Sequence, residues 1–189
     1  MSTYTELRGL KVKYLAANPD PGTAGDVWYD SAAFALKGFV GRAAWSAGSA
    51  LTTARQAAGG AGTLTAGLVF GGTNADGTAY NAQTEEYNGS GWAAGGDINT
   101  ARQDGASAGT QTAGLFAGGE GGGSDNESEE YNGSTWTEGA NINTARRSLG
   151  SFGTQTAAIA GGGYTTAVVD STESYDGTNW TEVANINTA

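Results

Sequence analysis

The chain has 189 residues, of which 33 are Gly and 2 are Pro, and it contains neither Cys nor His. Without Cys and His there is no disulfide framework, zinc site, thiol nucleophile or Ser-His-Asp triad, so the sequence predicts no catalytic residue, no cofactor and no metal. Nine basic against 19 acidic residues give a formal net charge of −10, which argues against nucleic acid as a partner.

Other whole-chain features favour a folded, soluble protein made in a cytoplasm. The 5 Trp, 8 Tyr and 5 Phe argue against disorder. No apolar run has the length of a membrane span, and the N-terminus lacks a signal-peptide core, so we expect no membrane insertion. The absence of Cys leaves the redox compartment open.

The charge distribution places a boundary near residue 50. Residues 1–50 hold five basic and four acidic side chains, whereas residues 51–189 hold four basic and 15 acidic ones. Pro19 and Pro21 lie in a stretch that predicts a linker or a tight corner. We therefore expect residues 1–25 to form an attachment segment and linker, and residues 26–50 a β-hairpin head or a partial blade.

An internal repeat organises residues 51–189. Successive markers are 43 to 47 residues apart, and we expect all of them to be structural positions: Trp45, Trp92, Trp136 and Trp180; Tyr87, Tyr131 and Tyr175; Arg55, Arg102 and Arg146; and the pairs Gly71-Gly72, Gly118-Gly119 and Gly161-Gly162. Three complete repeats cover about 52–99, 100–143 and 144–189, and Trp45 marks a partial repeat before them.

Local signals predict four antiparallel strands in each repeat. The runs 105–112 and 113–119 are apolar, bounded by Gly and too short for a helix. Asn-Gly or Asp-Gly then separates a Glu-x-Tyr segment from the Trp, which predicts a hairpin with a type I′ turn; these dipeptides are Asn88-Gly89, Asn132-Gly133 and Asp176-Gly177. A four-stranded meander of this length has the size of a propeller blade.

These markers together resemble the kelch repeat: an apolar strand ending in Gly-Gly, a Glu-x-Tyr strand, a Trp five residues after the Tyr, and an Arg ten residues after the Trp. The resemblance covers residues 51–189. It implies an all-β fold of kelch-like β-propeller blades, in which Tyr and Trp pack between blades. Three blades are fewer than the roughly four to eight that close a ring. The chain is then either a piece of a longer array or a homo-oligomer whose ring a second chain closes.

The segment GDVWYDSAAFALKG resembles a hairpin at the head of bacteriophage tail-fibre and other virion proteins. The resemblance rests on Gly25, Trp28, Tyr29, Asp30, Ser31, Leu36 and Lys37. A head of this kind followed by Thr-, Gly- and Ala-rich repeats is similar to structural proteins of tailed phages. It implies a virion location and attachment to other virion proteins through the N-terminus.

Several tempting sites have a structural explanation. Glu85, Glu129 and Glu173 recur once per repeat, which favours a structural part over catalytic carboxylates. The acidic group Asp125, Glu127, Glu129 and Glu130 lacks the spacing of a calcium loop, which favours a solvated loop. The segment 174–180 is one residue shorter than a sialidase Asp box, and a galactose-oxidase-like copper site needs His. Tyr80 and Tyr164 are the surface aromatic candidates.

Three function classes follow. We expect a bacteriophage virion structural protein of tail-fibre or appendage type, not an enzyme, whose N-terminus docks on the particle and whose repeats bind a host-surface glycan or protein. The variable loops 74–79 and 120–130 would then face outward. A generic kelch-type protein- or glycan-interaction module is the alternative. The residue inventory disfavours the third class, a carbohydrate-active enzyme.

Overall fold

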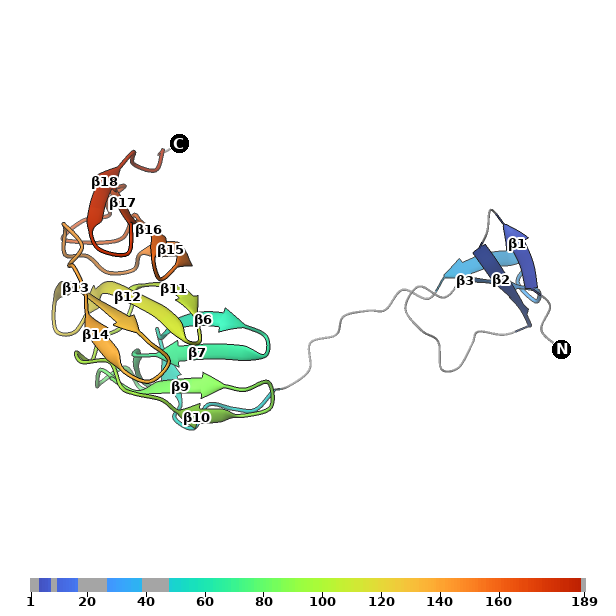
Figure 1. Cartoon of the computed structure of the whole chain (residues 1–189), viewed down its shortest axis with the longest axis horizontal. Coiled ribbons are helices and arrows are strands. Elements are labelled where there is room, and N and C mark those ends of the chain that lie inside the picture. The colour runs from blue at the N-terminus through green and yellow to red at the C-terminus, as the bar shows by residue number, and fades with distance from the viewer. Residues whose placement is uncertain (1–3, 8–9, 17–26, 39–47, 188–189) are drawn as a thin grey trace. The chain divides into compact units, whose positions relative to one another are not determined.

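The computed structural model describes residues 4–7, 10–16, 27–38 and 48–187. It divides into two compact units, Met1–Ala47 and Gly48–Ala189. Trp45, Gly25 and both prolines, and with them the predicted linker and the lead-in to the repeat, lie outside the described residues. Every regular element in the described ranges is a β-strand, which confirms the all-β prediction (Figure 1).

The first unit contains one mixed sheet with the strand order β1-β2-β3-β4. Its strands are β1 (Tyr4–Leu7), β2 (Leu10–Leu15), β3 (Val27–Asp30) and β4 (Ala35–Gly38). Strands β2 and β3 are parallel, and the other two pairs are antiparallel. The hairpin β3–β4 lies within the predicted head, while β1 and β2 lie within the predicted attachment segment.

Asp30 explains why the head motif forms a hairpin. Its buried Oδ1 accepts the backbone N–H groups of Ala32 and Ala33, each at 3.0 Å, which caps the turn. Lys37 Nζ donates to Oδ2 of the same carboxylate at 2.6 Å. These bonds, first of all that from Lys37, hold the pKa of Asp30 below its ordinary value. Trp28 precedes this turn and is buried.

The second unit contains three four-stranded antiparallel sheets, which we call blades 1, 2 and 3. Blade 1 is β6 (Gly59–Thr63), β7 (Ala66–Phe70), β9 (Thr84–Tyr87) and β10 (Trp92–Ala94). Blade 2 is β11 (Ala106–Thr110), β12 (Ala113–Glu120), β13 (Ser124–Tyr131) and β14 (Trp136–Glu138). Blade 3 is β15 (Gly150–Thr154), β16 (Ala157–Gly161), β17 (Thr172–Tyr175) and β18 (Trp180–Val183). Two short strands, β5 (Arg55–Gln56) and β8 (Thr73–Asn74), pair beside blade 1.

The blades follow one another in chain order without closing a ring (Figure 1). Their first strands are neighbours, because β11 lies against both β6 and β15. Ser107 N–H donates to Ser151 Oγ at 2.8 Å, and Ser151 Oγ–H donates back to Ser107 O at 3.0 Å. Blade-like sheets are therefore shown, whereas a closed propeller is not.

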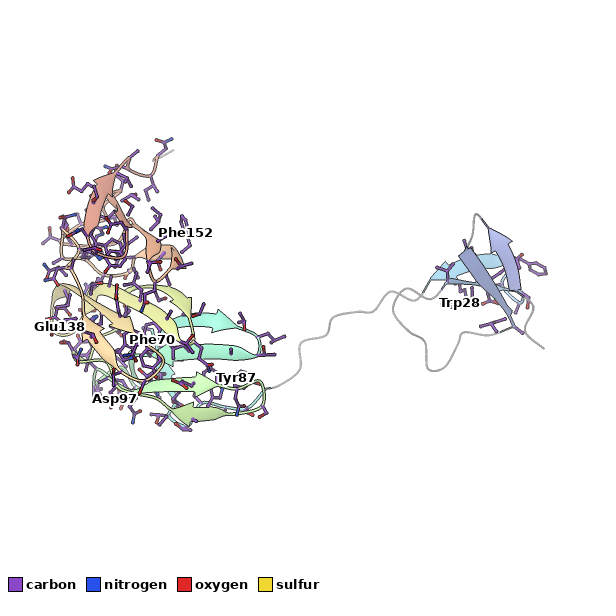
Figure 2. The ribbon with its side chains drawn as sticks, viewed as in Figure 1. Trp28, Phe70, Tyr87, Asp97, Glu138 and Phe152 are labelled. Atoms are coloured by element: carbon purple, nitrogen blue, oxygen red, sulfur yellow. The ribbon has the colours of Figure 1, made fainter. Side chains whose placement is uncertain are left out.

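Both hydrophobic clusters lie between blades rather than inside one. Leu68, Phe70 and Ile98 of the first repeat pack against Phe116, Tyr131 and Trp136 of the second. Figure 2 shows Phe70 inside this region. Its ring lies 5.1 Å from that of Phe116 and 4.7 Å from that of Trp136, both edge to face. The equivalent cluster between blades 2 and 3 is built on Leu115, Ile142, Tyr175 and Trp180.

At two equivalent positions of blades 2 and 3, the large and the small residue are interchanged. Phe116 of blade 2 covers Gly105, where an added Cβ would lie 2.4 Å from the ring. In blade 3 the equivalent pair is Ala160 and Leu149, and Leu149 packs against the cluster instead. The interface therefore keeps its filling although neither residue is repeated.

Two sequence-based predictions need correction. The Tyr–Trp hairpins form as predicted, but each turn has four residues, as in 132–135 between the paired Tyr131 and Trp136. Only the Gly has a positive φ (88° at Gly133), so the turn is not type I′. Asn132 Oδ1 instead accepts the N–H groups of Ser134 and Thr135, which fixes an Asx turn.

The third glycine pair is also shifted by one residue from its predicted position. Gly71 and Gly118 have φ of 63° and 64°, and the matching value of 66° belongs to Gly162. The equivalent pair is therefore Gly162-Gly163 rather than Gly161-Gly162, which makes the spacing 44 residues, as for the other markers. A Cβ on Gly71 would lie 2.6 Å from the carbonyl oxygen of Arg102, so this position also requires Gly for close packing of successive repeats.

Candidate functional site

The repeated Arg and Glu residues form buried ion pairs inside each repeat. Arg102 Nη1 pairs with Glu129 Oε1, and both side chains are fully buried. Glu129 also accepts the N–H groups of Asn99 (2.6 Å) and Thr100 (3.4 Å). Arg55–Glu85 at 2.5 Å and Arg146–Glu173 at 2.7 Å repeat this arrangement.

These bonds tie the Asn-Thr-Ala-Arg segment to the blade that follows it. Burial alone would raise the pKa of Glu85, but the N–H groups of Thr52 and Thr53 and the charge of Arg55 lower it below its ordinary value. A carboxylate held ionised in this way is a poor general acid. The geometry therefore agrees with a structural role for this series.

The repeated Tyr and Trp residues of blades 2 and 3 lie against the preceding blade. Tyr131 O–H donates to Glu86 Oε1 of blade 1 at 2.5 Å, and Tyr175 O–H donates to Glu130 of blade 2 at 2.6 Å. Burial, followed by the bond to Glu86, raises the pKa of Tyr131 to about 12. Trp136 and Trp180 are buried and leave no face for a sugar, whereas Trp92 is half-buried.

The two ends of the blades differ sharply. One end carries the short turns 64–65, 111–112 and 155–156 and the four-residue Asx turns, which are nearly the same in every repeat. The other end carries the connections between the second and third strands, where length and sequence vary most. We call it the loop end, formed by residues 56–58, 73–80, 103–105, 120–126, 147–149 and 163–169.

A regular backbone ridge crosses the loop end. Ala57, Asp104 and Ser148 occupy equivalent positions and have positive φ of 54°, 57° and 56°. Asp104 N–H donates to Ala57 O at 3.2 Å, and Ser148 N–H donates to Asp104 O at 2.7 Å, so the ridge runs through all three repeats. A left-handed backbone at Ala or Ser is unfavourable, and its threefold recurrence marks the ridge as a built feature.

Beside this ridge, each repeat has a pair of residues with the same backbone pairing but a different combination of side chains. The adjacent pairs are Gln56 with Thr73, Gln103 with Glu120, and Arg147 with Tyr164, each joined by backbone pairing. Gln103 Nε2 donates to Glu120 Oε2 at 3.2 Å. Thr73 is buried, so the first repeat presents only Gln56 here, whereas the second presents Gln103 and Glu120 and the third Arg147 and Tyr164.

The third set lines an open hollow of about 460 Å³, together with Ser148, Gly163 and Val168. The Arg147 guanidinium carbon lies 5.2 Å from the centre of the Tyr164 ring. Arg147 also pairs with Glu120 of the preceding repeat. The hollow thus offers a cation, an aromatic ring and an apolar side chain close together, a set that suits a polar ligand with an apolar face.

Two acidic groups of the loop end resist ionisation. Burial, followed by the negative charge of Glu120, raises the pKa of Asp104, and Arg147 opposes this only in part. Burial and the neighbouring Glu127 raise the pKa of Asp125. Both carboxyl groups are therefore protonated more readily than an exposed Asp.

The prediction of a solvated acidic loop is wrong, because Asp125, Glu127, Glu129 and Glu130 belong to strand β13 and Glu129 is buried. Glu129 points to Arg102 and Glu130 to Tyr175, while Glu127 lies 3.9 Å from Arg102. Within the described ranges no group of three or more acidic side chains could hold a metal ion. The same residues include no helix with the length and apolarity to cross a membrane.

Both predicted surface aromatics are exposed at the loop end: Tyr164 lines the hollow, whereas Tyr80 lies in the segment 73–80 of the first repeat, where it is bridged to Thr73. The sequence analysis missed Arg147, Gln103 and the ridge. Only Arg147 had a signal, because the residue after the repeated Arg changes from Gln to Gln to Arg while the Ala-Arg before it recurs in all three repeats. No protein-family model matches this chain, and no curated protein matches it either.

Proposed function

We propose that the chain is a virion structural protein of a tailed bacteriophage, of tail-fibre or appendage type. Its N-terminal unit attaches to other virion proteins, and the loop end of its blades binds a glycan or protein on the host surface. The protein is not an enzyme in this proposal and needs no cofactor. The resemblance of the head motif and of the repeats to phage structural proteins supports the virion assignment.

One observation carries the binding role. The loop end repeats its backbone three times, but its side chains change to Glu120 in the second repeat and to Arg147 and Tyr164 in the third, whereas the Arg–Glu pairs of the interior recur in all three repeats. A surface selected only for folding has no need of such variation on a constant frame, while a recognition surface does. That surface includes the hollow lined by Arg147 and Tyr164.

The test uses particles complemented with variants of the full chain. Deletion of residues 1–47 should remove the protein from the particle, because it removes the whole first unit. Arg147→Ala combined with Tyr164→Ala should leave the protein mounted and reduce adsorption to host cells. Thr178→Ala, in an exposed turn of the short-turn end, is the matched control and should change neither. Normal mounting of the deleted form would refute the attachment role.

The second candidate is a kelch-type interaction module that works away from any particle. The hollow favours it equally, since its cation and aromatic ring belong to the blades alone. A glycan and protein binding screen with the purified full chain separates the two proposals. Binding that requires Arg147 and Tyr164, by a protein that no particle incorporates, would favour the module.

A further inference from the structure

We propose that two copies of this chain dock head to tail, with blade 3 of each copy against blade 1 of the other, to complete a ring of six blades. The proposal concerns assembly and does not rest on the proposed function. We call the side of a blade that contacts the next blade its trailing face, and the side that contacts the preceding blade its leading face. In the described structure, blade 3 has an open trailing face and blade 1 an open leading face.

Exposure of equivalent residues shows that both open faces are halves of an interface. Ile98 and Ile142 lie on the trailing sides of blades 1 and 2 and expose 2% and 1% of their surface. Their equivalent Ile186 exposes 53%. On the leading side, Tyr131 and Tyr175 are buried, whereas Tyr87 is only half-buried.

The two internal interfaces establish which polar groups meet. Gln111 Nε2 donates to the carbonyl oxygens of Gly67 and Tyr87 in the preceding blade, at 3.2 and 2.8 Å. Gln155 makes the same two bonds to Gly114 and Tyr131. At the loop end, the second glycine of each pair donates to the carbonyl of the next repeated Arg, at 2.9 Å in both interfaces.

Both open faces depart from this scheme. Blade 1 carries Leu64 at the position of the two Gln residues, and Leu64 is almost fully exposed. Blade 3 carries Ser174 where Glu86 and Glu130 accept the Tyr hydroxyl. The proposed interface between blade 3 of one copy and blade 1 of the other therefore lacks the Gln on one side and the carboxylate on the other. Apolar contacts make up a larger part of it than of the two internal interfaces.

The first strands supply a size match for this proposed interface. Ser107 and Ser151 point from their own strands toward the preceding blade, and Ala108 points the opposite way into the cluster between blades 2 and 3. In blade 3 the residue equivalent to Ala108 is Phe152, which is 69% exposed and projects from β15 (Figure 2). In blade 1 the residue equivalent to the two Ser is Gly60, which has no side chain.

The largest trailing residue of the series is thus matched by the smallest leading one. Phe152 of one copy fits against β6 of the other, whose sequence Gly-Gly-Ala-Gly-Thr leaves room for a ring. Removing the apolar surface of a Phe ring from water favours association. In a monomer the Phe152 ring is exposed to water. In the docked pair both Phe152 rings, one from each copy, are buried.

A ring of six blades has an ordinary size. Propellers have roughly four to eight blades, and the second unit contains three four-stranded sheets. Two copies therefore supply a number of blades within that range. The two contacts between copies are then identical by symmetry, and no blade face stays open.

The first test is the molar mass of the full chain by light scattering across a dilution series. We expect close to twice the chain mass of 18.9 kDa, falling on dilution. Gly60→Trp fills the space for Phe152 and should give the monomer, and its own Cβ meets nothing nearer than 3.6 Å, which lets the blade fold. Gly123→Trp, at an exposed loop-end glycine with open space around it, is the matched control and should remain dimeric.

The second test places the photo-crosslinking analogue benzoylphenylalanine at Phe152. Irradiation of mixed isotope-labelled and unlabelled protein should join residue 152 to residues 59–63 of a different chain, as a dimer. The same analogue at the exposed Val168 should give no dimer. A monomeric wild type, a crosslink within one chain, a crosslink to another segment, or a ladder of higher multimers would each overturn the proposal.

Discussion

Replacing Ser128 with Thr should stabilise the protein, because it repairs a defect at the interface between blades 2 and 3. In the preceding interface, Trp136 Nε1 donates to Thr84 Oγ1 at 2.9 Å in a buried site. The equivalent groups are Trp180 Nε1 and Ser128 Oγ. Both are buried, and neither has a hydrogen-bond partner among the described residues.

The methyl group of Thr84, which Ser128 lacks, explains why Trp136 has a hydrogen-bond partner and Trp180 has none. There is space for the same methyl group at position 128. In blade 1 the Thr84 methyl lies 3.3 Å from where a Cβ of Gly95 would be, so it packs over that glycine and limits the rotation of the hydroxyl. Gly139 is the equivalent glycine beside Ser128, and the atom nearest to an added Cβ there is 3.4 Å away. A Thr at 128 therefore has the same glycine to cover and the same Trp to bind.

The gain follows from two contributions. A restored hydrogen bond contributes about 1 kcal/mol, and a buried methyl about 0.8 kcal/mol. We therefore expect Ser128→Thr to raise the free energy of unfolding by about 1–2 kcal/mol and the Tm by about 2–8 °C. Urea unfolding followed by Trp fluorescence and circular dichroism measures the first, and a thermal scan the second.

Two further variants separate the hydrogen bond from the methyl. Ser128→Val adds the methyl but no hydroxyl, so it should fall short of Ser128→Thr by about the value of the bond. Thr84→Ser should lose stability in the first interface by an amount similar to the gain. A Val variant as stable as the Thr variant would refute the repair of the Trp180 bond.

Three other changes test the interior and the loop end. Glu129→Gln should lower the free energy of unfolding by roughly 3–5 kcal/mol, because it leaves the charge of Arg102 buried without its counter-ion; a loss below about 1 kcal/mol in urea unfolding would contradict a buried pair. Trp136→Ala should cost roughly 3–5 kcal/mol in the same assay, and the half-buried Trp92→Ala clearly less; equal losses would contradict the difference in packing. Asp104→Asn should raise the Tm at neutral pH, since the folded protein raises the pKa of Asp104, chiefly by burial, and so loses stability as pH rises through that value. Below the ordinary pKa of Asp the two proteins should melt alike, and an offset that persists there in thermal scans would contradict this explanation.

The repeat spacing was sufficient to predict the blades because backbone-driven features recur with it. Strand runs and the Tyr–Trp pairing depend on residues close in sequence, and both were predicted, whereas the turn type between Tyr and Trp was not. The I′ prediction failed because the side chain of Asn132 binds two backbone N–H groups. Those bonds favour a longer turn over the two-residue one that Asn-Gly alone indicates.

The loop end was harder to predict, because its geometry depends on contacts between repeats. A positive φ at Ala57 or Ser148 has no signal in residue type, since neither residue favours that conformation. The bond from one ridge residue to the next holds it, and that bond requires the blades to be adjacent. The shift of the third glycine pair had the same cause, because three consecutive Gly at 161–163 allow two alignments until the backbone decides.

One residue of the loop end, Glu120, contacts side chains of two repeats, and this affects how the loop end could bind a ligand. Glu120 accepts from Gln103 of its own repeat and pairs with Arg147 of the next. The cation that lines the hollow of blade 3 is therefore positioned by a carboxylate of blade 2. A ligand that draws Arg147 toward itself must weaken this pair, and the charge of Glu120 then acts more fully on Asp104, whose ionisation it already opposes. The second and third sets of side chains are thus coupled through Glu120 and Arg147, so the ligand preference of blade 3 depends on the blade that precedes it.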